Sequence, residues 1–164
     1  MAYDIVNPII GAQPIADTST TKHHPLGTIV QATDPTLGAG EFVYLTGVVS
    51  TLLGSFVTYN ASDNTTALLA VNAIGPVGVA MSVNVAGPNY GWYQISGKAT
   101  GKALTAFADN GNVYATSTAG SIDDAVVAGD LVKLAKGAST VGTPSTGLAY
   151  FEIHRPFMDD GLTA

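Results

Sequence analysis

The sequence contains no cysteine and very little charge. Without cysteine the chain has no disulfide, no thiol nucleophile and no cysteine-based zinc site. Charged residues make up 11% of the 164 residues, which is about half the usual share. A soluble monomer normally keeps a more highly charged surface, so we expect much of this surface to be covered by other copies or by a partner.

Basic residues are especially scarce. The chain has 6 Lys and Arg against 12 Asp and Glu, a formal net charge of -6 and a pI near 4.6. General nucleic-acid binding proteins carry a strongly basic face, so this balance argues against that class.

Targeting and membrane segments are not expected either. Residues 1–10 have no basic start and contain Asp4 and Pro8, so they do not resemble a secretory signal. The stretch between Asp63 and Lys98 carries no charged residue, but Gly-Pro pairs and asparagines interrupt it. A membrane helix needs about 20 mostly apolar residues without such interruptions, so we expect no membrane span.

Residues 77–85 show the clearest strand pattern. Bulky apolar side chains occupy every second position, and small or polar residues fill the positions between. Because side chains alternate between the two faces of a strand, the pattern predicts one bulky face and one small face. Gly78, Ala80 and Ser82 on the small face would let another backbone approach closely. After a Gly-Pro-Asn turn, residues 92–96 resume strand chemistry.

Short strands separated by turns are predicted along the rest of the body. A glycine followed by alternating bulky residues marks turn-to-strand entries. These entries lie at residues 40–45, 54–59, 111–116 and 129–134. Further strands are expected at residues 28–32, 66–71, 98–104 and 148–154. The pattern predicts an all-β fold, a compact β-barrel or β-sandwich.

Two local motifs add detail to this expectation. Asn110-Gly111 is a strong signal for a two-residue hairpin turn. Ser121 followed by Asp124 resembles a capping box, which predicts one short helical piece over residues 121–128.

The chain divides into an extended N-terminal arm at residues 1–26, a β-rich body at 27–158 and a short tail at 159–164. Prolines in the arm disfavour helix and remove ladder donors. Its isoleucines would be poorly placed in a free tail, so the arm either wraps its own domain or lies across a neighbouring subunit. The candidate partner-contact residues are Tyr3, Ile5, Ile9, Ile10 and Ile15.

No group of residues makes a persuasive catalytic or metal site. His23 and His24 are adjacent, so on an extended chain they point to opposite sides, and His154 is distant. The sequence shows no nucleophile elbow and no phosphate-binding loop. We therefore expect no enzyme activity, no cofactor and no metal.

Aromatic residues near residue 92 leave one binding alternative open. Trp92 and Tyr93, with Tyr90 nearby, are of the type that stacks on a sugar ring. Aromatic residues on a strand more often belong to a core or an interface.

Several runs resemble head decoration (cement) proteins of tailed bacteriophages. These runs are Gly27–Ala32, Asp34–Gly38, Gly40–Leu45, Ala73–Met81, Gly91–Ile95 and Ile153–Met158. The likeness covers most of residues 27–158, and its motifs are structural.

The resemblance implies a structural virion protein that binds the outside of a phage capsid and stabilises the shell. Its implied partners are the major capsid protein and copies of itself, with a homotrimer preferred to a dimer. The implied location is the capsid exterior, after synthesis in the bacterial host cytoplasm. A phage tail or fibre module and a carbohydrate-binding β module remain the alternatives.

Overall fold

The computed structural model describes residues 4–6, 11–84 and 88–158. They form twelve strands and no helix, which confirms the predicted all-β fold. The strands are β1 (Asp4–Ile5), β2 (Thr18–Ser19), β3 (Ile29–Asp34), β4 (Gly38–Thr46), β5 (Phe56–Tyr59), β6 (Thr66–Leu68), β7 (Gly75–Ala80), β8 (Tyr90–Lys102), β9 (Asn112–Ala115), β10 (Ile122–Asp123), β11 (Leu131–Gly137) and β12 (Leu148–Met158).

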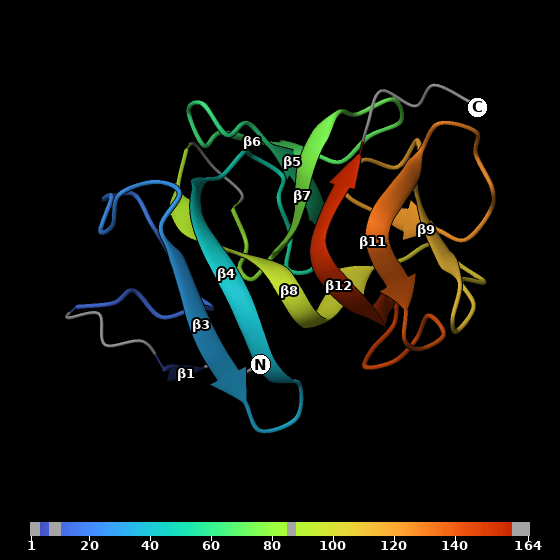
Figure 1. Cartoon of the computed structure of the whole chain (residues 1–164), viewed down its shortest axis with the longest axis horizontal. Helices are drawn as coiled ribbons and strands as arrows, with labels where there is room; N and C mark the ends of the chain where they lie inside the picture. Colours follow the sequence, from blue (N-terminus) through green and yellow to red (C-terminus); the bar gives the residue numbers. More distant parts are fainter. Residues whose placement is uncertain (1–3, 7–10, 85–87, 159–164) are drawn as a thin grey trace.

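All strands pair antiparallel in one connected sheet, in the order β1-β3-β4-β8-β7-β12-β11-β9-β10. β2 adds to β8, and β5 joins β6 to β7. The sheet bends over itself, which fits a sandwich or an open barrel. Figure 1 shows β8 crossing from the β3–β4 side of the molecule to the β12–β11 side.

The 13-residue strand β8 is the centre of this arrangement. Its first half pairs with β4 and β7, and its second half pairs with β12. β12 also pairs antiparallel with β7. Three straight strands cannot all be antiparallel to one another, so β8 and β12 must bend.

Both bends coincide with irregularities in the strands. In β8 an extra residue opposes β4 where Glu41 and Phe42 pair with Ser96 and Gln94. In β12 extra residues oppose the step from Lys133 to Ala135 of β11. Such bulges bend a strand and increase its twist.

The bend in β8 is built around Gly97. Its φ of +100° is one that L side chains rarely adopt, and a Cβ there would overlap the carbonyl oxygen of Ala39. The buried Gln94 side chain stabilises the turned backbone: its Nε2 donates to the carbonyl oxygens of Ser96 and Lys98, at 3.1 and 3.2 Å.

Three apolar clusters fill the spaces between the folded layers. The largest lies under β8, β11 and β12 and includes Phe56, Phe107 and Phe151. Side chains from the two faces of β4 pack into the other two clusters. Phe42 and Tyr44 pack into one with Trp92, whereas Val43 and Leu45 pack into the other with Tyr93.

The strand predicted at residues 77–85 is present but shorter. β7 ends at Ala80, Val83 is exposed, and Val85 lies outside the described residues. The small face of β7 is not open to another molecule, because a Cβ at Gly78 would meet Tyr93 Cβ at 3.3 Å. The small residues of β7 therefore make room for a tyrosine of the same chain.

Two local predictions are wrong. Residues 121–128 form no helix; Ile122 is fully buried and pairs with Ala115 of β9. Asn110 does adopt the expected positive φ of 58°, in a turn closed by Gly111 N donating to Ala108 O. This turn joins no hairpin, because β9 pairs with β10 and β11.

We expect Gly97→Ala to destabilise the protein by about 3 kcal/mol or more, because it adds a backbone overlap to an unfavourable φ. Gly38→Ala is the matched control. Gly38 has φ +79°, but no atom lies within 4 Å of the position that a Cβ would take, so the cost is about 1 kcal/mol. Urea denaturation measures both, and equal losses would show that the Ala39 contact does not constrain the bend.

Candidate functional site

The N-terminal segment is held on the body through the backbone and the side chain of one buried residue, Gln13. Trp92 Nε1 donates to the Gln13 carbonyl oxygen at 2.8 Å, and the Tyr44 hydroxyl donates to Gln13 Oε1 at 2.8 Å. The Gln13 backbone N–H donates to His24 Nε2 at 3.0 Å. Gln13 is 6% exposed, so these bonds are shielded from water.

Further contacts extend this attachment in both directions. Gln13 Nε2 donates to the carbonyl oxygens of Asp17 and Tyr90, at 2.7 and 3.2 Å. β2 then pairs with the start of β8. The His24 ring lies edge-on to Tyr44, with ring centroids 5.1 Å apart. Residues 11–26 therefore cover the aromatic cluster of their own domain.

The candidate partner-contact residues fall into two groups. Tyr3, Ile9 and Ile10 lie outside the described residues, so their contact with a partner stays a prediction. Ile15 is 2% exposed and packs in the cluster around Trp92, and Ile5 is partly buried against the same cluster. For these two the structure agrees with the alternative in which the segment covers its own domain.

The aromatic residues considered for sugar stacking do not form an exposed platform. Trp92 is fully buried and Tyr93 is 4% exposed. Tyr90 is partly buried and stacks on Tyr44, with ring centroids 6.4 Å apart. These rings pack in the interior, so the carbohydrate alternative has no support from them.

The histidines do not form a metal or catalytic centre within the described part of the chain, which holds no group of three or more metal-ligating side chains. His23 Nε2 lies 3.1 Å from Ser19 Oγ, on an exposed turn where Ser19 Oγ also accepts from Thr21 N. An activated serine needs an oriented base in a protected site, and this pair is open to water. His154 pairs with Glu152 at 3.1 Å, also at the surface.

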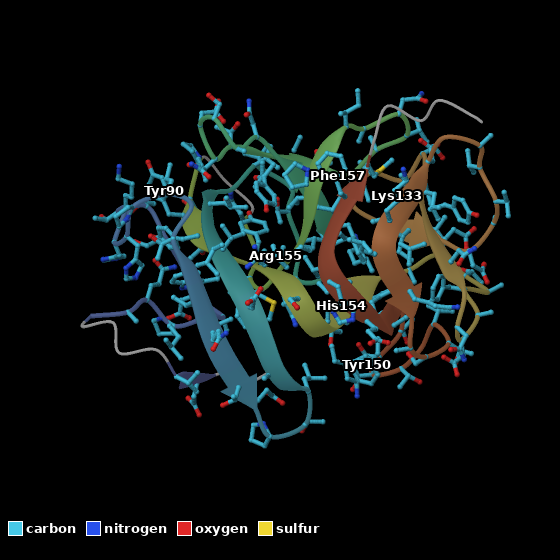
Figure 2. All side chains as sticks on the ribbon, in the orientation of Figure 1. Tyr90, Lys133, Tyr150, His154, Arg155 and Phe157 are labelled. Atoms are coloured by element: carbon cyan, nitrogen blue, oxygen red, sulfur yellow. The ribbon has the colours of Figure 1, made fainter. Side chains whose placement is uncertain are left out.

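The outer face of β8, β12 and β11 carries most of the basic residues, which the overall composition does not reveal. Five of the six basic residues of the chain lie on these strands. They are Lys98, Lys102, Lys133, Lys136 and Arg155. Figure 2 shows Lys133, His154, Arg155 and Phe157 along β11 and β12. A chain with a net charge of -6 therefore has a locally basic face.

Strand register places Lys98 and Lys136 on one side of the sheet. Glu152 of β12 pairs with Lys98 on one side and with Lys136 on the other, and directly paired residues share a face. Arg155 Nη2 lies 3.1 Å from Glu41 Oε2, an ion pair that links β12 to β4. Sequence patterns could not reveal this face, because the lysines come from segments far apart in the chain.

A cleft of about 360 Å³ lies at one end of this face. Three loops border it, and β8 and β12 form its floor. Its apolar lining is Leu37, Leu53, Pro144, Leu148 and Tyr150. Thr100 also lines the cleft; it is 3% exposed, and its hydroxyl has no hydrogen-bond partner among the described residues. The Thr100 hydroxyl oxygen is closed to solvent, so what the cleft offers a partner is its apolar side chains.

Comparison with protein-family models, with curated proteins and with solved structures gives no match. No helix able to span a membrane occurs in the portion of the chain that the structure describes.

The contact between Gln13 and His24 predicts a pH-dependent stability. His24 Nε2 accepts a hydrogen bond only while the ring is neutral, and burial, with a smaller effect of His23, lowers the pKa of His24. The stabilisation is therefore complete above the ordinary pKa of 6.5 and is lost as the pH falls toward the lowered pKa. We expect a lower Tm at pH 5 than at pH 7 and a red-shifted emission of Trp92, which is the single tryptophan.

His24→Gln and His23→Gln separate this effect from the titration of carboxylates. His24→Gln should reduce the Tm difference between pH 7 and pH 5, whereas His23→Gln, at an exposed position, should keep most of it. An unchanged pH dependence in His24→Gln would show that the ring does not control the attachment.

Proposed function

We propose that this protein is a structural virion component that binds the outer surface of a tailed-phage capsid as a homo-oligomer and stabilises the shell. The resemblance of residues 27–158 to phage head decoration proteins supplies the capsid and the virion location. The molecule acts through surfaces rather than through a reaction.

The observation that carries this proposal is the amount of apolar side chain at the surface of a chain with little charge. Ile74 and Leu134 are each 64% exposed, and Val126 is 79% exposed. Val49, Leu52 and Phe157 are each more than 40% exposed. Only 11% of the residues are charged. Such a surface is typical of a protein that is covered by partners in its working state.

The geometry of the N-terminal segment restricts where a capsid-binding arm begins. Residues 11–26 are attached to the body through Gln13 and β2, and β1 pairs with the edge of β3. A contact with a neighbouring capsid subunit is therefore proposed for the residues before Gly11, which include Tyr3, Ile9 and Ile10.

The phage tail or fibre module stays the alternative within the same structural class. It predicts that the protein sediments with tails or fibres rather than with capsids. The comparison requires capsids and tails of the phage that encodes the chain, incubated separately with the purified protein.

Two truncations test the arm. Removing residues 2–10 should reduce capsid occupancy and lower the Tm only modestly, because the pairing of β1 with β3 and the packing of Ile5 are lost while the Gln13 contacts remain. Removing residues 2–20 should lower the Tm much further, since the loss of buried Ile15 alone costs about 2 to 5 kcal/mol. Thermal melting and co-sedimentation with capsids measure the two effects.

Each part of the proposal has its own contrary result. If the shorter truncation occupies capsids as well as the full chain does, residues 2–10 are not the capsid contact. If the full chain leaves capsids unoccupied at micromolar concentration and does not raise their melting temperature, the decoration function is wrong.

A further inference from the structure

The cleft beside β8 and β12 has a mainly apolar lining. One carboxylate, that of Asp34, also lines it, and its Oδ1 already accepts from Thr36 N and Leu37 N. Leu37, Leu53 and Leu148 line the cleft, and Tyr150 completes the apolar wall. Lys98 Nζ lies 4.1 Å from the centre of the Tyr150 ring. Lys102 pairs with Leu148, so two lysines flank the cleft.

The loop that follows β10 has the complementary character. Asp123 and Asp124 lead directly into it, and Val126, at 79% exposure, is the most exposed of the large apolar residues that the structure describes. Val127 is 41% exposed. The loop thus presents an exposed apolar side chain two residues after the Asp123-Asp124 pair in the sequence.

This loop is held in shape at both ends. Ile122 before it is fully buried, and Asp130 after it is 2% exposed, with Oδ1 accepting from Asn72 N at 2.6 Å. Asp124 Oδ2 accepts from Ala108 N at 3.0 Å. A loop whose conformation is already restricted loses less entropy when it binds, which favours its use as a docking element.

We infer that residues 123–127 of one copy dock in the Leu37–Leu53–Leu148–Tyr150 cleft of a second copy. Val126 enters the cleft, and the two carboxylates lie near Lys98 and Lys102. The contact is head-to-tail, because the loop and the cleft are different surfaces of the chain. This inference rests on the homo-oligomer part of the proposed function and is independent of the capsid.

Charge and composition favour a second copy over a polyanion as the occupant. Glu152 sits between Lys98 and Lys136, and Glu41 pairs with Arg155, so carboxylates alternate with the cations on this face. A nucleic acid would meet these carboxylates along its backbone. A loop with two acids and one valine needs only the two lysines and the apolar cleft.

Charge reversal of the two surfaces tests the inference. The cleft variant carries Lys98→Glu and Lys102→Glu, and the loop variant carries Asp123→Lys, which leaves Val126 in place to enter the cleft. Each alone places like charges across the contact, so its self-association Kd should rise at least about tenfold. Mixing the two variants restores opposite charges and should restore association. Sedimentation velocity of the full chain at about 1 to 100 μM measures every case.

Two controls keep the readout specific. Lys22→Glu changes the same charge at an exposed position outside the face, and Val83→Lys places a lysine at another exposed apolar site. Both should self-associate like the wild type, and the Tm of every variant shows that it is folded. If a cleft variant with Glu at residues 98 and 102 is unfolded, Lys102→Glu alone replaces it.

Each result supports or overturns the inference. Loss in both variants and recovery in the mixture support it. A wild type that stays monomeric overturns both this contact and the proposed self-association, while capsid binding is judged separately. A wild-type oligomer that either variant leaves intact, or whose loss the mixture does not reverse, places the contact elsewhere and leaves the homo-oligomer standing.

Discussion

The bend of β8 at Gly97 is the constraint on which the other layers depend. A single strand can pair with β4 and β7 and then with β12 only if its direction changes midway. Gly97 permits the change because it lacks the Cβ that would overlap Ala39, and Gln94 satisfies the carbonyl groups on both sides of the turn. The exposed Glu41–Arg155 pair near this corner contributes about 0 to 1 kcal/mol, so backbone geometry stabilises the corner more than charge does.

In the N-terminal attachment, a single polar residue holds the segment on the body mainly through hydrogen bonds. Gln13 uses its backbone and its amide to satisfy the Trp92 indole and the Tyr44 hydroxyl. Without Gln13 the buried Trp92 indole N–H would lose its acceptor, which costs about 1 to 3 kcal/mol. The Tyr44 hydroxyl would keep only the bond that it accepts from His23 N. Ile15 then closes the cluster. The proline content predicts an irregular segment. From Gly11 onward, this segment covers the aromatic cluster around Trp92.

Alternation along the chain predicted most strands, because a period of two directly reflects which side chains face a core. It could not predict which strands pair. Ser121 and Asp124 match a helix start locally, yet pairing of Ile122 with Ala115 overrides that preference. The partners of Gln13 lie 31 and 79 residues away at Tyr44 and Trp92, so no local pattern reveals its role. The cleft and the basic face likewise exist only after β8, β11 and β12 are brought together.

The positions of the few charges matter as much as their small number. Few charges leave apolar surface free to supply the energy of assembly, but apolar surface alone does not select an orientation. In the contact that we infer, Lys98 and Lys102 beside the cleft and the carboxylates before Val126 would supply that selection, because two clefts facing each other would bring the lysines of both copies together. With the proposed contact, copies of this β body would join in one direction, and other exposed apolar side chains, such as Ile74, would stay free for the proposed contact with a capsid.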